Sequence, residues 1–319
     1  MCAEPAVGQV TRMSGRAMVG LFLVYAMWAS TWPVGKYALT YWTPLGLTAI
    51  RHVVAGTLLI LLAVLMGNRL QLPSRSEIMI GATQYMLYYL LSYAALSAGT
   101  ASVTAVVVGL YPVIVVFLSK GKTENRRYII WPALVGAVGC LVIFMGVPSS
   151  EGVGYPIASL LLGVGAAAAQ ALATLIRREV TNKASVVGFT GRSMLVGGAL
   201  AVAVAVITHD SLVIDATQEY AIWALIWLTL IGSAGTFLCV EFLLRKWPPS
   251  TFSISFLAVP CLAYLFSHAA LGERLSFISL AGIIICGVAI FLASSWKINV
   301  SAAHKARSCL LYTSPSPRD

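Results

Sequence analysis

The sequence contains very little charge for its length. Only 10% of its 319 residues are Asp, Glu, Lys or Arg, whereas 59% are hydrophobic, and the mean hydropathy is +0.87. An ordinary soluble domain carries about 25% charged residues. The shortage of charge therefore excludes a soluble enzyme or binding domain and predicts an all-α polytopic membrane protein.

Acidic residues are missing from the middle of the long apolar runs. Glu77 begins the third run, and Glu241 lies near the inner end of the eighth. A carboxylate buried in the membrane is the usual carrier of protons or sodium ions. Its absence argues against a strongly ion-coupled pump of that design. A facilitator or an exchanger stays open, as does proton transfer by His52 or His268.

The six cysteines are scattered, and no pair has the CxxC spacing of a metal site or a redox motif. Four lie inside apolar runs, where a cysteine usually serves as a small hydrophobic residue. The chain also lacks a patch of interleaved basic and aromatic residues, although its net charge is +10. We therefore expect no metal, no cofactor and no nucleic-acid partner.

Ten apolar runs are long enough to cross a bilayer, because about 20 helical residues rise about 30 Å. Short joints rich in Gly, Pro, Ser or charge separate them. The runs span residues 17–38, 44–66, 77–97, 100–119, 128–146, 156–177, 184–207, 220–243, 249–269 and 275–296.

Unusual residues coincide when the chain is shifted along itself. A shift of 148 residues places Pro112 on Pro260, and a shift of 141 places Arg51 on Arg192. We therefore interpret the chain as two copies of a five-helix unit. Because five is odd, the second copy crosses the membrane in the opposite sense. Such a 5+5 inverted repeat is typical of secondary transporters, whose two halves share one central site.

The copies are expected at residues 17–146 and 156–296. Residues 297–319 lack a helical period, and we interpret them as a disordered tail with a non-native end.

Basic residues gather in alternate loops, which predicts the orientation of the chain in the bilayer. With both termini in the cytoplasm, the outer loops hold only Lys36 and Arg274. We therefore expect an integral protein of a bacterial-type inner membrane. The inner loops then hold Arg12, Arg16, Arg69, Arg75, Lys120, Lys122, Arg126, Arg127, Arg177, Arg178, Lys183, Arg245 and Lys246.

Distinctive residues occur in both copies. They are Trp28, Pro33, Lys36, Pro44 and Arg51 in the first copy and Pro260, Leu271-Gly272-Glu273, Gly282 and Gly287 in the second. Together they resemble the drug/metabolite transporter superfamily, in particular its EamA-type exporters. One departure is the segment 121–125, where that family usually has a Leu-Gly-Glu turn. The resemblance implies ten helices in two repeats and the movement of amino acids, sugars, nucleotide-linked metabolites or drugs, usually outward.

Two arginines inside apolar runs are candidate substrate ligands. Arg51 lies about seven residues into the second run, and Arg192 about eight into the seventh. A charge at membrane depth costs about 2.5–3.5 kcal/mol on insertion scales, so it usually serves a function. Each guanidinium would hold a carboxylate or another anionic group. The alternative is that each side chain extends to the lipid headgroups.

Aromatic and amide side chains complete the predicted substrate site. Tyr85 and Tyr89 are four residues apart and share one helix face, which suits the wall of an amphipathic cavity. Trp28 and Gln170 lie near mid-depth on the first and sixth runs, which the repeat makes equivalent. The alternative for all four is helix packing.

Two prolines interrupt the fourth and ninth runs. Pro112 and Pro260 each free a backbone carbonyl at mid-membrane. They are interpreted either as hinges for gating or as static kinks that help the helices to pack.

Two short motifs resemble those of enzymes, but neither fits its context. Gly163-x-Gly165-x-x-Ala168 lies within an apolar helix and follows no strand, unlike a dinucleotide-binding loop. Gly232-Ser233-Ala-Gly235 has its serine in the wrong place for a membrane serine protease.

We therefore expect a non-enzymatic transporter that exports a small metabolite such as an amino acid by alternating access. The alternatives are an exporter of cationic drugs, a non-transporting receptor and an intramembrane enzyme. The sequence leaves the oligomeric state open.

Overall fold

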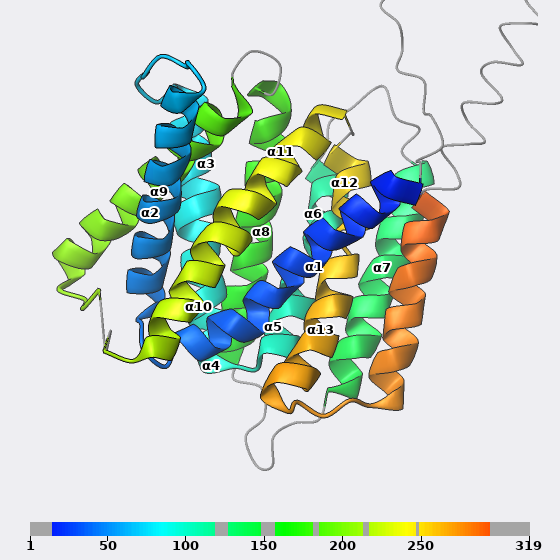
Figure 1. Cartoon of the computed structure of the whole chain (residues 1–319). Coiled ribbons are helices and arrows are strands. Elements are labelled where there is room, and N and C mark those ends of the chain that lie inside the picture. The colour runs from blue at the N-terminus through cyan, green and yellow to red at the C-terminus, as the bar shows by residue number, and fades with distance from the viewer. Residues whose placement is uncertain are drawn as a thin grey trace, which may run out of the picture.

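The computed structural model describes residues 15–118, 127–147, 157–180, 185–212, 217–246 and 249–293 (Figure 1). Every regular element within those ranges is a helix. The expected disordered tail and the segment 121–125 lie outside the described residues.

The first half of the chain is helical, with one π-helical turn (η1) and one helix break between α5 and α6. These helices are α1 (Gly15–Ala38), α2 (Pro44–Leu65), α3 (Arg75–Ile80), η1 (Gly81–Tyr88), α4 (Tyr89–Ala98), α5 (Ala101–Val108), α6 (Tyr111–Leu118) and α7 (Arg127–Gly146).

The second half repeats that order. Its helices are α8 (Ile157–Val180), α9 (Val186–Thr208), α10 (Glu219–Thr229), η2 (Leu230–Gly235), α11 (Thr236–Lys246), α12 (Pro249–Ser255), α13 (Ala258–Leu271) and the last helix, Phe277–Ala293.

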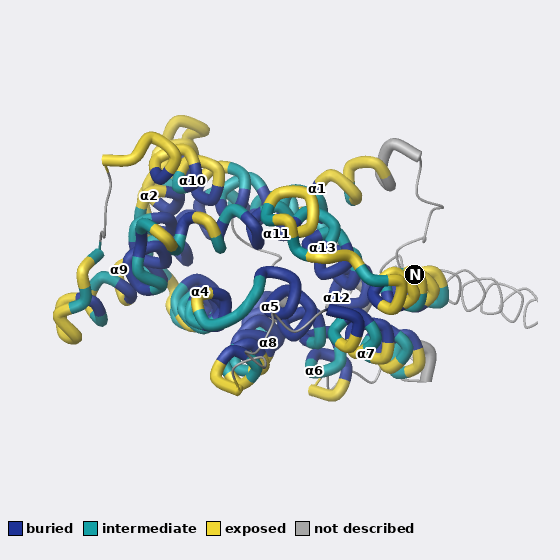
Figure 2. Tube along the Cα trace, turned by 90° about the horizontal axis from the view of Figure 1, so that it is seen from below, coloured by how far each residue is buried: buried dark blue, intermediate teal, exposed yellow. Residues whose placement is uncertain are grey.

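Seven helical segments in the described residues are long and apolar enough to cross a membrane, and the last helix is a shorter apolar one. Large apolar side chains cover the outside of the bundle; Ile207 is 76% exposed and Phe277 is 91% exposed. Figure 2 shows buried residues toward the middle of the bundle and exposed residues toward its rim. The predicted polytopic all-α membrane protein is confirmed, whereas the count of ten membrane helices stays a prediction.

The two halves have their helix irregularities at corresponding positions. The fourth predicted helix is broken between α5 and α6, and the ninth between α12 and α13. Pro112 and Pro260 each lie in the first turn after the break, where a missing backbone N–H costs no helical hydrogen bond. The two breaks also meet, because a Cβ on Gly109 would lie 2.7 Å from Cγ of Pro260. The π-helical turns η1 and η2 likewise occupy corresponding places in the third and eighth predicted helices.

Corresponding helices of the two halves run in opposite directions. The Glu273 carboxylate, just after the end of α13, accepts hydrogen bonds from the backbone N–H groups of Ala101 (3.0 Å) and Ser102 (3.2 Å), at the start of α5. The beginning of the fourth predicted helix therefore lies beside the end of the ninth. This antiparallel arrangement is what an inverted repeat requires.

Helices α2 and α9 pack through reciprocal glycine contacts. A Cβ on Gly56 would lie 2.6 Å from the backbone nitrogen of Leu195, and a Cβ on Gly198 would lie 2.6 Å from that of Val53. Residues 53 and 195 differ by 142, as do residues 56 and 198. The two contacts are therefore equivalent under the repeat, so its pseudo-two-fold axis passes between these helices.

We predict that Gly56→Ala destabilises the protein, because the added methyl group would clash with backbone rather than with a movable side chain. Overpacking of this kind costs about 1–3 kcal/mol. Gly287→Ala is the matched control, since a Cβ there would meet nothing within 4 Å. Thermal unfolding in detergent, followed by tryptophan fluorescence, should show a lower Tm for Gly56→Ala only. Equal melting of both variants would contradict the close contact.

Candidate functional site

Arg51 is fully buried near the middle of the bundle. Its Nε donates a 2.7 Å hydrogen bond to Oγ of Ser233, and its Nη1 donates one to the hydroxyl of Tyr93. The guanidinium carbon lies 4.4 Å from the ring centroid of Tyr89, which is the geometry of a cation–π contact. The side chain therefore turns into the protein and does not reach toward the lipid headgroups.

Aromatic rings surround this guanidinium from several helices. Phe237 connects them, because its ring centroid lies 5.2 Å from that of Trp28 and 5.0 Å from that of Tyr85. The His52 ring lies 4.5 Å from Tyr89 and 5.4 Å from Tyr85. The structure thus brings four of the predicted site residues together: Trp28, Arg51, Tyr85 and Tyr89.

Several polar atoms of this cluster are buried without a hydrogen-bond partner among the residues that the structure describes. They include Nη2 of Arg51, the hydroxyl of Tyr89 and Nε2 of His52. Nearly all buried polar atoms in proteins are paired, and each unpaired one costs about 1–3 kcal/mol. The cluster therefore retains hydrogen-bonding capacity that a bound polar ligand can use.

A glycine leaves room beside the free nitrogen of Arg51. A Cβ on Gly232 would lie 3.0 Å from Nη2. Gly232 and Ser233 both belong to the π-helical turn η2, where the wider backbone presents these two residues toward α2. The motif that resembles a serine protease in the sequence therefore serves in the structure to position an arginine.

Gln170 is buried and is paired with another amide side chain. The side-chain amide of Gln84 donates to Oε1 of Gln170, and both residues are at most 2% exposed. Arg177, seven residues further along α8, donates a 2.9 Å hydrogen bond from Nη2 to the Tyr85 hydroxyl.

Arg177 also forms an ion pair with Glu241, and both side chains are only 2% exposed. The prediction that Arg177 is a loop charge is wrong, because α8 continues to Val180. Glu241, predicted near the inner end of the eighth run, is buried within α11. The signal that could have revealed Arg177 as buried was its seven-residue spacing from Gln170, which places both residues on one helix face.

Arg192 lies apart from the Arg51 cluster. Its Nε and Nη2 donate to Oε1 of Glu77 at 2.9 Å and 2.6 Å, and its side chain is 13% exposed. The packing of α2 against α9 explains why Arg192 lies apart. The glycine contacts between these helices fix the repeat offset at 142 residues. At that offset Arg51 corresponds to Ser193 and not to Arg192. One residue turns a side chain by about 100° around a helix. The predicted pairing of the two arginines was therefore wrong by one residue.

An inverted repeat with broken helices that meet, together with a buried polar cluster, is typical of membrane transporters. A family model supports this class. The model of the EamA-like transporter family matches residues 15–147 and 157–295. The chain belongs to this family, and the resemblance to the drug/metabolite transporter superfamily is confirmed.

Curated relatives agree at low identity. An uncharacterized transporter of Archaeoglobus fulgidus is 24% identical over 271 residues, which cover 82% of this chain and 92% of that protein. An uncharacterized transporter of Bacillus subtilis is 22% identical over 285 residues, covering 88% and 91%. A chloroplastic WAT1-related protein of Arabidopsis thaliana is 24% identical over 287 residues, covering 85% and 67%.

One solved crystal structure has the same fold. It superimposes with a TM-score of 0.70 at 15% identity, and the match covers 90% of this chain and 99% of that one.

We predict that Glu241→Gln strongly destabilises the protein, because it leaves the Arg177 guanidinium buried without a counter-charge. Removing one partner of a buried ion pair costs about 3–5 kcal/mol. The double variant Arg177→Met with Glu241→Leu should recover most of that loss, which thermal unfolding can measure. If Glu241→Gln melts like the wild type, the ion pair does not exist in solution.

Proposed function

We propose that this transporter exports a small metabolite that carries an anionic group, such as an amino acid, by alternating access. The single observation that carries the proposal is the buried Arg51, which lacks a carboxylate partner in the described part of the chain and keeps Nη2 free. A carboxylate of the substrate would supply both the counter-charge and the missing hydrogen bond.

The distribution of carboxylates favours an anionic group over a cation. Glu77 and Glu241 are the acidic residues among the buried side chains of the described structure, and each is matched to an arginine. A cationic drug would therefore meet a free guanidinium and no free carboxylate. This charge balance argues against the exporter of cationic compounds.

The aromatic walls suit a substrate with an apolar part. Trp28, Tyr85 and Tyr89 would contact that part, while the free Tyr89 hydroxyl would bind a polar group. Gln170 would contact the substrate only after its hydrogen bond with Gln84 breaks. Arg192 would reach a substrate only on release from Glu77, so we assign it to the path between the site and the adjoining membrane face.

Burial of the cluster supports a mechanism in which helices move. Arg51, Tyr85 and Tyr89 are at most 4% exposed, so a solute can reach them only after the surrounding helices separate. The breaks before Pro112 and Pro260 are related by the repeat and contact each other. Bending at one break and then at the other would open the same site to opposite faces in turn. We propose these prolines as the hinges.

We also propose an inner-membrane location with both termini in the cytoplasm, on the basis of the loop charges. On this orientation, α2 ends and α9 begins at the cytoplasmic face, whereas Glu273 and the start of α5 lie at the outer face.

The direct test is flux in proteoliposomes with a panel of labelled amino acids, sugars and cationic dyes. The proposal expects flux of a carboxylate-bearing solute. Flux of dyes alone would favour the drug exporter. Binding without flux would favour a receptor, and chemical turnover of a bound compound would favour an enzyme.

We predict that Arg51→Gln weakens transport of the solute found in that panel about tenfold or more, since a hydrogen bond to a charged group contributes about 1.5–3 kcal/mol. Arg51→Lys should restore only part of the activity, because an ammonium cannot form the same planar fork. Arg274→Gln is the control for the loss of one exposed positive charge. Transport by Arg51→Gln at the wild-type rate would rule Arg51 out as a ligand.

A further inference from the structure

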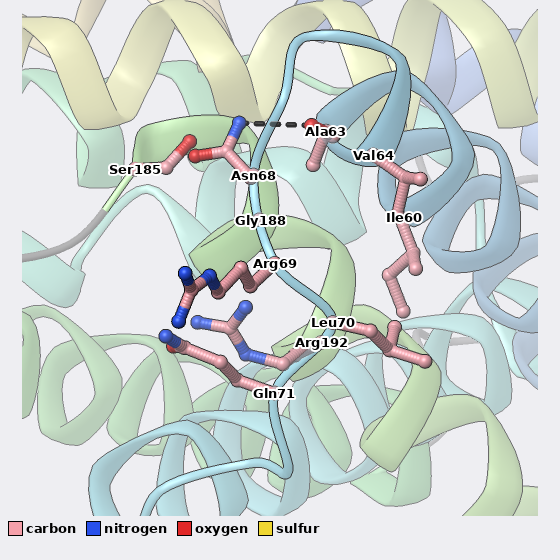
Figure 3. Close-up of a pocket in the computed structure, with 10 residues that line it drawn as sticks. All are labelled: Ile60, Ala63, Val64, Asn68, Arg69, Leu70, Gln71, Ser185, Gly188 and Arg192. Carbon is pink, nitrogen blue, oxygen red and sulfur yellow. Dashed lines mark hydrogen bonds between the residues drawn. The ribbon is translucent and has the colours of Figure 1, made fainter.

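A separate pocket of about 170 Å³ lies where α2 ends and α9 begins, against the segment that connects α2 to α3 (Figure 3). Arg69, Gln71 and Arg192 line its polar side, and Ile60 and Val64 line its apolar side. Ile60 is nine residues beyond Arg51 on α2, which corresponds to about 14 Å along the helix. The pocket is therefore distinct from the buried Arg51 cluster.

Arg69 and Arg192 both line this pocket, and in the view of Figure 3 their guanidinium groups project in the same direction. Glu77 accepts hydrogen bonds from Nε and Nη2 of Arg192 and is the one carboxylate among the described residues that binds either arginine. Arg69 makes no hydrogen bond or ion pair within the described part of the chain. Two positive charges with one negative charge leave an excess that an anion can neutralise.

The surroundings of the pocket indicate a ligand with an apolar part. Leu70 lines the pocket and is 75% exposed, and Leu72, two residues further along the same segment, is 91% exposed. Such a segment belongs at the boundary between lipid and water, where apolar side chains enter the membrane and arginines bind headgroups. A volume of about 170 Å³ is also smaller than the usual ligand pocket of about 300–1,000 Å³, so it suits a headgroup.

We propose that this pocket binds the phosphate group of an anionic phospholipid from the adjoining leaflet. The phosphate oxygens accept hydrogen bonds from Arg69 and from the part of the Arg192 guanidinium that Glu77 leaves free. Guanidinium–phosphate pairs are short, directional and charge-assisted. The acyl chains lie along Ile60, Val64 and Leu70 on the lipid-facing side. A bound lipid would thus tie the segment after α2 to the start of α9.

The test compares lipid binding by wild-type protein, Arg69→Gln and Arg75→Gln. Arg75 begins α3, is exposed and does not line the pocket, so its substitution removes the same charge nearby. Detergent-purified protein is titrated with phosphatidylglycerol or with phosphatidylcholine of identical acyl chains. Native mass spectrometry counts the retained lipid, and thermal unfolding measures the stabilisation that a ligand of the folded state must produce.

We expect wild-type protein and Arg75→Gln to retain one phosphatidylglycerol and to melt at a higher temperature with it than with phosphatidylcholine. Arg69→Gln should bind it about tenfold more weakly, and Arg69→Lys should recover part of the affinity. Equal loss in Arg69→Gln and Arg75→Gln, or equal binding of the two lipids, would overturn the site. Inorganic phosphate that stabilises as well as the lipid would overturn the assignment to a phospholipid. None of these readouts depends on transport activity.

Discussion

The structure depends on a guanidinium group held where water and lipid headgroups cannot reach it. Burying a charge is costly unless hydrogen bonds and counter-charges replace its hydration. Arg51 receives part of this replacement from Ser233, Tyr93 and the face of Tyr89. Among the described residues no carboxylate contacts Arg51, and the buried carboxylates, Glu77 and Glu241, are each paired with another arginine. The Arg51 guanidinium is thus a buried cation without an ion-pair partner in the described part of the chain.

The inverted repeat places this cation at the centre. Helix α2 packs on α9 through reciprocal glycine contacts, which bring the two backbones close and set the axis that relates the halves. The π-helical turn η2 presents Ser233 to Arg51. The helix breaks of the two halves also contact each other, at Gly109 and Pro260. If the halves exchange shapes as we propose, a site built from both of them would open to the two membrane faces in turn.

Periodicity and charge were enough to predict the fold, because the bilayer demands long apolar helices and leaves few alternatives. They also indicated Trp28, Arg51, Tyr85 and Tyr89, which the structure gathers into one cluster. They could not fix the repeat to within one residue, since apolar helices share too few distinctive residues. The offset of 141 instead of 142 therefore assigned Arg192 to the wrong helix face. The ion pair of Arg177 and Glu241 was missed because each residue, considered alone near a helix end, is typical of a loop charge.

The most direct test of this account is the affinity of the wild-type protein for a transported carboxylic acid compared with its neutral amide analogue. Both molecules have nearly the same size and shape, so the ratio isolates the charge. If Arg51 binds the substrate anion, the acid should bind about tenfold or more tightly to the wild type, and the ratio should fall to about one in Arg51→Gln. An undiminished ratio in the variant, or equal affinities in the wild type, would contradict the central role of this arginine.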